Sequence, residues 1–155
     1  MIKTNVMRLL KQAKIIHQIG EYSLQTDKHF GQQAKEQLAL QSDAIFKTLV
    51  TRGDKNGINV FCISVNNQLD LKKAAKASGN KKIEMLPAKE VLATTGYIVG
   101  ACSPIGMKKL YPTYIDETAT LFDSIGISAG ARGEEIILNP SDLCEYINGT
   151  FADLI

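Results

Sequence analysis

The chain has no tryptophan, and its aromatic residues are few: five tyrosines and five phenylalanines among 155 residues. Proteins that bind single-stranded nucleic acid without sequence preference stack the bases on aromatic side chains. The composition therefore argues against a base-stacking platform. The net charge of +2 is also small, so any contact with nucleic acid has to come from a local basic patch.

Cysteine and histidine are scarce as well. The three cysteines (Cys62, Cys102 and Cys144) are far apart, no CxxC pair exists, and the two histidines are His17 and His29. These residues offer neither the ligand spacing of a zinc site nor the framework of a disulfide-rich domain. We therefore expect no metal and no cofactor.

Long apolar stretches are missing too. No run reaches the roughly 18 apolar residues of a membrane span, and the N-terminal residues lack the apolar core of a signal peptide. We therefore expect a cytoplasmic protein. With 45% hydrophobic and 22% charged residues the chain falls in the globular range, and we expect residues 1–155 to form a single domain.

Two stretches of small residues stand out: Gly100-Ala-Cys-Ser-Pro-Ile-Gly106, the first glycine loop, and Ser128-Ala-Gly-Ala-Arg-Gly133, the second glycine loop. Both lie between apolar runs typical of strands. Glycines at such spacing let the backbone approach a ligand closely and direct N–H groups at its oxygens. We predict that the two loops and Lys47 form one pocket.

The order of the expected helices and strands is irregular. Thr4 is the expected N-cap of a first helix, and helices are also expected at 32–40, 71–78, 87–93 and 140–148. Strands are expected at 15–19, 44–50, 58–65, 81–85, 97–99, 113–116, 125–128 and 134–138. Asn56-Gly57 predicts a hairpin between the second and third of these strands. The pattern favours a mixed α+β sheet or barrel over a doubly wound parallel sheet.

Lys47 lies in an apolar run, where strand alternation would put it on one face with Ile45 and Leu49. A charge on an apolar face costs free energy unless it meets a partner or a cavity, so Lys47 is a candidate functional residue. The alternative is an edge-strand lysine that opposes aggregation or extends to water. The pattern alone leaves both interpretations open.

The first glycine loop could hold an oxyanion or a phosphate with its backbone, or it could be a plain turn. It matches no P-loop, no GxGxxG fingerprint and no Gly-x-Ser-x-Gly nucleophile elbow. Its cysteine, Cys102, is expected to be inert rather than a nucleophile. In the second loop Ser128, Gly130, Arg132 and Gly133 could contact a phosphate or a ribose, or could close a hairpin with a solvated arginine.

Lysines are concentrated in the middle of the chain. They either form the solvent-exposed face of a helix or lie together on a surface that attracts a polyanion such as RNA. The residues are Lys72, Lys73, Lys76, Lys81, Lys82, Lys108 and Lys109.

Six segments carry a resemblance to a known family. They are Phe46-Lys-Thr-Leu49, Leu69-Asp-Leu-Lys-Lys-Ala-Ala75, Lys81-Lys-Ile-Glu-Met85, Thr95-Gly-Tyr-Ile-Val-Gly100, Ser103-Pro-Ile-Gly106 and Ser128-Ala-Gly-Ala-Arg-Gly133. Together, and in this order, they resemble the YbaK-type Cys-tRNA(Pro) deacylases (the YbaK/EbsC family), which are related to the editing domain of prolyl-tRNA synthetases. The resemblance extends over essentially the whole chain.

The resemblance implies a mixed, largely antiparallel twisted sheet or partial barrel flanked by helices. It also implies a hydrolase that removes a wrong amino acid from tRNA, a task that arises because a synthetase pocket cannot strongly reject a near-isostere. By the same resemblance Lys47 and Gly100 are the catalytic residues. The residues implied to bind substrate are Tyr22, Phe30, Ser103, Ser128, Gly130, Arg132 and Glu135.

The family further implies a thiol-assisted reaction on Cys-tRNA(Pro) without a cofactor or a metal, and prolyl-tRNA synthetase as a partner. The chain departs from the family pattern in both loops. Ala101 and Cys102 stand where relatives carry Gly-Ile, and Ala129 and Ala131 replace a glycine and a lysine. These departures affect substrate choice, so deacylation of Ala-tRNA(Pro) and non-catalytic binding to tRNA or a synthetase remain alternatives.

Overall fold

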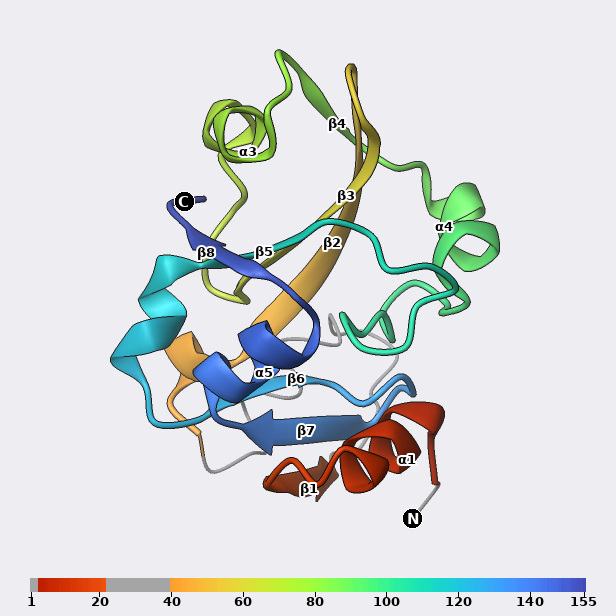
Figure 1. The fold of residues 1–155 in the computed structure, drawn as a ribbon, viewed down its shortest axis with the longest axis vertical. Helices are drawn as coiled ribbons and strands as arrows, with labels where there is room; N and C mark the ends of the chain where they lie inside the picture. Colours follow the sequence, from red (N-terminus) through yellow and green to blue (C-terminus); the bar gives the residue numbers. More distant parts are fainter. Residues whose placement is uncertain (1–2, 22–39) are drawn as a thin grey trace.

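A computed structural model describes residues 3–21 and 40–155 (Figure 1). The described helices are α1 (Asn5–Gln12), α3 (Leu71–Ser78), α4 (Ala88–Thr95) and α5 (Pro140–Tyr146), with the short 3-10 helices η1 (Ser42–Ala44) and η2 (Glu117–Leu121). The strands are β1 (His17–Glu21), β2 (Phe46–Gly53), β3 (Gly57–Ser64), β4 (Ile83–Met85), β5 (Thr113–Asp116), β6 (Ile125–Ser128), β7 (Glu134–Leu138) and β8 (Thr150–Ala152). They form a three-stranded sheet in the order β1-β7-β6 and a five-stranded sheet in the order β4-β2-β3-β5-β8.

The β2–β3 hairpin is the longest pairing in the larger sheet. Its antiparallel register runs from Phe46 opposite Ser64 to Gly53 opposite Gly57. Gly57 has φ +79°, a conformation that glycine adopts without a steric penalty. The hairpin predicted from Asn56-Gly57 is thereby confirmed.

The larger sheet is mixed rather than uniformly antiparallel. β3 pairs with β5 and β5 with β8, both in parallel, whereas β4 joins β2 antiparallel. The strand β8 has no counterpart among the sequence expectations, because three residues give too short a pattern to detect. The smaller sheet is antiparallel throughout.

The two sheets meet where β2 begins. Ile45 forms a parallel bridge with Gly126 of β6, so the first residues of β2 run alongside the second half of β6. Within the described residues the sheets do not close into a barrel. The expected α+β class with mixed sheets flanked by helices is confirmed.

The main core fills the space between the sheets. Phe46, Cys62 and Ile115 of the larger sheet pack with Val6 and Leu10 of α1. The smaller sheet adds Ile125, Ile127 and Ile136 to this core. A second cluster lies on the other face of the larger sheet, where α3 covers Phe61 and Ile63. Figure 1 shows the result: α1 lies beside the smaller sheet at one end of the molecule, and α3 lies at the opposite end.

The helix ends follow the capping residues of the sequence. The Thr4 hydroxyl accepts a hydrogen bond from the Met7 N–H, and the Asn139 side chain accepts from Ser141 and Asp142. Gly79 and Gly96 end α3 and α4 with left-handed φ angles of +75° and +88°. These boundaries match the predicted ones within a few residues.

Several expectations differ from the structure. The strands expected at 44–50 and 81–85 are observed at Phe46–Gly53 and Ile83–Met85. The first strand begins at His17 rather than at residue 15, because residues 13–15 form the turn that ends α1. The strand expected at 97–99 is wrong: these residues form an irregular turn after α4, and the Thr95 hydroxyl accepts a hydrogen bond from the Tyr97 N–H there. The helix expected at 32–40 lies almost entirely outside the described residues. None of the described helices is long and apolar enough to cross a membrane.

Candidate active site at the two glycine loops

The two glycine loops are fastened to each other by side chains of the second loop. The Ser128 hydroxyl donates a hydrogen bond to the Ala101 carbonyl at 2.8 Å, and Arg132 Nη2 donates to the Val99 carbonyl at 3.0 Å. The structure therefore brings together segments that lie about thirty residues apart in the sequence.

The second loop closes the β6–β7 hairpin. The Gly130 N–H donates to Ser128 Oγ at 3.1 Å, and the Ala129 N–H donates to the Glu134 carbonyl at 3.1 Å. Gly130 has φ +90°, and a Cβ on it would lie 2.9 Å from Tyr97 Cε1. The position therefore requires glycine both for its backbone conformation and for the close approach of the tyrosine ring.

The first loop is an irregular turn held by side chains. Gly100 has φ +88° and is exposed, and the Ala101 N–H donates to the Ile98 carbonyl at 3.0 Å. The Ser103 side chain is buried, and its hydroxyl accepts a hydrogen bond from the Ile105 N–H. Ser103 thus holds the shape of the loop, whereas its predicted contact with substrate stays a prediction.

The first loop also offers backbone donors. Among the described residues, neither the Gly100 N–H nor the Cys102 N–H forms a hydrogen bond. An N–H that no protein group occupies can stabilise negative charge on a bound ligand, provided that the ligand approaches the backbone closely. The exposed Gly100 permits that approach.

Lys47 reaches the same region through β2. The parallel bridge joins Ile45 to Gly126, and Lys47 and Ser128 each lie two residues further along their strands. Lys47 is half-buried, and its ammonium group forms no hydrogen bond or ion pair within the part of the chain described. Burial lowers its pKa because it removes water from the ammonium group. A partly desolvated cation of this kind gains free energy from an anionic ligand.

An apolar cavity of about 170 Å³ adjoins Gly100 and the residues of β2 that follow Lys47. It lies between β2, the segment that leads into α4, and the start of the first loop. Its lining consists of Thr48, Leu49, Val50, Met85, Leu86, Ala88, Val91, Val99, Gly100 and Cys102. The catalytic glycine implied by the resemblance therefore lies at the wall of a cavity that β2 also lines.

Glu135 is a buried carboxyl in the same region. It lies on β7 opposite Ser128 of β6 and is only 5% exposed. Its Oε2 atom has no hydrogen-bond partner among the described residues, and burial raises the pKa of the carboxyl to about 8. Such a group is held largely neutral at pH 7 and would ionise beside a bound ammonium group.

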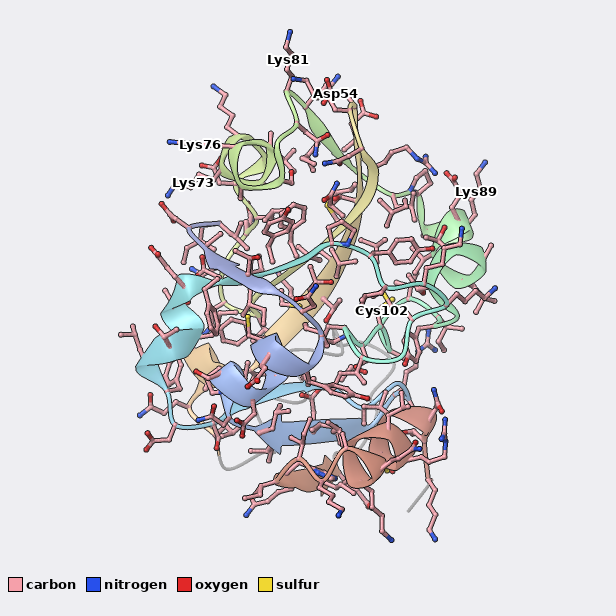
Figure 2. The ribbon with its side chains drawn as sticks, in the orientation of Figure 1. Asp54, Lys73, Lys76, Lys81, Lys89 and Cys102 are labelled. Carbon is pink, nitrogen blue, oxygen red and sulfur yellow. The ribbon has the colours of Figure 1, made fainter. Side chains whose placement is uncertain are left out.

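The thiol next to Gly100 is poorly suited to act as a nucleophile. Burial raises the pKa of Cys102, an effect opposed by the Thr95 hydroxyl, which lies 3.8 Å from its Sγ. Figure 2 shows Cys102 on the segment that follows α4. Nucleophilic cysteines instead have a lowered pKa. No group of three or more metal-ligating side chains occurs in the described residues.

Two of the predicted binding residues, Tyr22 and Phe30, lie outside the described residues. The sequence reasoning missed Tyr97, which braces both loops. Its hydroxyl donates to the Ile105 carbonyl, and its ring lies against the α-carbon of Gly130. Its position between Gly96 and Gly100 was the available signal, but the apolar neighbours Ile98 and Val99 favoured a strand.

Free backbone donors beside an exposed glycine, with a half-buried lysine on a neighbouring strand, are typical of a site that positions its substrate. The comparisons agree with that class. Residues 28–146 match the aminoacyl-tRNA editing domain family. The chain therefore belongs to the aminoacyl-tRNA editing domain family, and its resemblance to the YbaK/EbsC type is confirmed.

Individual relatives point the same way. The chain is 49% identical over 152 residues to EbsC of Enterococcus faecalis, named provisionally as a Cys-tRNA(Pro)/Cys-tRNA(Cys) deacylase; the match covers 98% of this chain and 93% of EbsC. It is 32% identical over 101 residues to the proline–tRNA ligase of Shouchella clausii, covering 65% of this chain and 18% of the ligase. A crystal structure described provisionally as a trans-editing enzyme for prolyl-tRNA synthetase matches with a TM-score of 0.84 at 23% identity, covering 99% of this chain and 98% of that one. That structure supports the fold.

Proposed function

We propose that this chain is a trans-editing hydrolase that cleaves the aminoacyl ester of mischarged Cys-tRNA(Pro). The observation that carries the proposal is the junction of the two glycine loops, where exposed Gly100 lies beside the strand of Lys47. The 49% identity to EbsC over nearly the whole chain supports the same substrate class. In this proposal the whole chain acts as one editing domain.

The ester would bind with its carbonyl oxygen towards the backbone of the first loop. As the carbonyl is attacked, negative charge develops on that oxygen, and the N–H groups of Gly100 and Cys102 are the donors available to it. Because these donors belong to a fixed turn, they need no reorganisation during the reaction.

The nucleophile in this proposal is the substrate's own thiol. The cysteine sulfur attacks the ester carbonyl, the bond to the ribose 3′ oxygen breaks, and the thiol proton passes to that oxygen. The amino acid leaves as a cyclic thiolactone, which water then opens to cysteine. This route needs no nucleophile from the protein, which agrees with the raised pKa of Cys102 and with the Ser128 hydroxyl being engaged with the Ala101 carbonyl.

Lys47 would balance the negative charge of the terminal nucleotide and hold it beside Gly100. Ser128, Gly130 and Arg132 would contact the same nucleotide from the second loop, and Tyr22 and Phe30 would border the pocket. Glu135 would accept the α-ammonium group of the amino acid, since a nearby cation restores the charge that burial suppresses.

The deciding experiment is a deacylation panel with Cys-, Ala-, Ser- and Pro-tRNA(Pro). We expect release of cysteine, and we expect Lys47→Ala to reduce the rate at least about 100-fold, the scale of losing one stabilising group in a catalytic site. Lys89→Ala on the exposed face of α4 is the matched control and should retain full rate (Figure 2).

Other outcomes of the panel would contradict parts of the proposal. Hydrolysis of Ala-tRNA(Pro) at a comparable rate would rule out an obligatory thiol and favour an alanine deacylase. Binding of tRNA without turnover on any of the four substrates would identify a non-catalytic binding module. Circular dichroism on Lys47→Ala separates loss of chemistry from loss of folding.

Selectivity for tRNA(Pro) would come from prolyl-tRNA synthetase as a partner. The resemblance of the chain to part of a proline–tRNA ligase supports this relation. Adding the synthetase should raise the rate on Cys-tRNA(Pro) but not on Cys-tRNA(Cys). An equal rate on both tRNAs in the presence of the synthetase would contradict the partnership.

A further inference from the structure

We propose that the outward face of α1 and Arg132 of the second loop bind the phosphate backbone of the RNA that leads to the site. This proposal rests on the proposed function, since it names the surface that the substrate of that site would use. The surface, named here the α1 basic strip, consists of Lys3, Arg8, Lys11, Lys14 and Arg132.

The first observation is that α1 lies directly against both glycine loops. A Cβ on Gly106 would lie 3.0 Å from Leu9 Cδ1, and a Cβ on Gly130 would lie 3.2 Å from Val6 Cγ2. Any nucleotide chain whose 3′ end lies between the loops therefore leaves the site close to α1.

The second observation is the charge that α1 presents to solvent. Val6, Met7 and Leu10 are buried, whereas Arg8 and Lys11 are exposed, as are Lys3 and Lys14 at the two ends of the helix. Arg8 donates to the Asn5 and Gln12 side chains, which are neutral. None of these four cations forms an ion pair with a described residue.

The third observation is the uneven distribution of charge along the chain. Residues 3–20 contain four basic side chains and no carboxylate. Residues 110–155 contain eight carboxylates and a single basic side chain, Arg132, which lies in the second loop beside α1. Four of these carboxylates, Glu117, Asp123, Asp142 and Glu145, are exposed on or next to η2 and α5. A polyanion is therefore repelled by that side of the molecule and attracted to the strip.

The lysines of α3 and the turn before β4 offer a competing surface and a matched control. Figure 2 shows Lys73, Lys76 and Lys81 at the end of the molecule opposite α1. Two lysines of this end are paired, Lys73 with Asp153 and Lys82 with Glu84. The hairpin that leads there extends about 20 Å beyond Lys47, at about 3.3 Å per residue. These lysines thus lie further from the glycine loops than the α1 basic strip does, and nearby carboxylates neutralise part of their positive charge.

The test compares two triple variants that change the net charge equally. One is Arg8→Gln/Lys11→Gln/Lys14→Gln in the strip, and the other is Lys72→Gln/Lys76→Gln/Lys81→Gln at the opposite end. The probe is an RNA hairpin without an attached amino acid, with the acceptor stem and single-stranded 3′ end of tRNA(Pro). Its affinity for each protein variant is measured as a function of salt concentration.

For the strip variant we expect an affinity loss of at least about tenfold at about 50 mM salt. The slope of log affinity against log salt should fall by about 2, since each phosphate contact to a single strand contributes about 0.7. The control variant should keep the wild-type slope. An equal loss in both variants, or a loss in the control alone, would overturn the proposal. Binding of RNA without an attached amino acid requires no turnover. The result therefore stands even if the protein deacylates none of the tRNAs in the panel.

Discussion

The two glycine loops have similar compositions but are built in different ways. The second loop closes a regular hairpin, so the register of β6 and β7 determines where Ser128 and Glu135 lie. The first loop follows a helix, and its conformation depends on contacts made by side chains from elsewhere: Tyr97 on one side and Ser128 on the other. Backbone pairing thus fixes one half of the site, and side-chain packing fixes the other.

This difference indicates which changes each half tolerates. A loop fixed by strand register should be sensitive to changes in backbone conformation and in the buried faces of its strands. A loop fixed by side-chain hydrogen bonds should be sensitive to the loss of a single hydroxyl. Four substitutions test this contrast.

The largest effect is expected at Glu135, buried on the regular half. Its pKa of about 8 in the folded protein exceeds the ordinary value of 4.5, so between these pH values the unfolded chain releases a proton that the folded chain keeps. The free energy of unfolding therefore falls as pH rises from about 5 to about 8. Glu135→Gln should remove this fall and be more stable than wild type by a few kcal/mol at pH 9.

Urea denaturation of wild type and Glu135→Gln at pH 5, 7 and 9 measures this difference. Glu145→Gln, on the exposed face of α5, is the control and should follow wild type. Parallel pH curves for wild type and Glu135→Gln would show that the carboxyl does not titrate in this window.

A smaller loss is expected when the conformation of the second loop is changed. Gly130→Ala places a side chain at φ +90° and 2.9 Å from the Tyr97 ring, which should lower the free energy of unfolding by about 2–3 kcal/mol. Gly57→Ala is the matched control, because its φ of +79° is similar but no atom lies within 4 Å of the added Cβ. It should lose about 1–2 kcal/mol. Equal losses in thermal or urea denaturation would mean that Tyr97 moves aside freely.

The third substitution tests the hydrogen bond between the loops. Ser128→Ala leaves the carbonyl of the buried Ala101 without its donor, which should lower the free energy of unfolding by about 1–2 kcal/mol. The deacylation rate should fall even under conditions where the variant is fully folded, since the first loop loses the contact that fixes it. Ser141→Ala is the control, as its exposed hydroxyl forms no hydrogen bond with a described residue. A stable but fully active Ser128→Ala would show that the first loop keeps its shape unaided.

The smallest effect on stability is expected at Arg132. Its hydrogen bond to the Val99 carbonyl is exposed, so Arg132→Gln should change the free energy of unfolding by less than about 0.5 kcal/mol. The affinity for RNA should nevertheless fall. It is measured with the RNA hairpin that carries no amino acid. A stability loss as large as that of Ser128→Ala would place Arg132 among the groups that hold the loops together.

Much of the regular structure could be predicted from the sequence. The strands at 113–116, 125–128 and 134–138 have the predicted bounds, because alternating apolar residues and flanking turn residues mark both ends. β8 was missed because its three residues give too short a pattern to detect. The error at 97–99 arose because Tyr97, Ile98 and Val99 have high strand propensity, whereas Tyr97 is used to brace the loops.

The site was predictable in its parts but not in its connections. Glycine spacing indicated two close-approach loops, and a lysine in an apolar run indicated an unusual charge. The bonds from Ser128 to Ala101 and from Arg132 to Val99 join segments that no local pattern relates. That Glu135 Oε2 is buried without a hydrogen-bond partner among the described residues likewise becomes evident only when the strands on either side of it are placed.

The bridge between Ile45 and Gly126 also bears on the order in which the protein acquires activity. It joins residues from opposite halves of the chain, and contacts of such sequence separation form late because loop closure must come first. The β2–β3 hairpin can form from local contacts, but the start of β2 lies beside β6 only when β6 has docked. Under the proposed function, a chain cut before residue 126 therefore carries Lys47 without the second loop and has no complete site for its substrate.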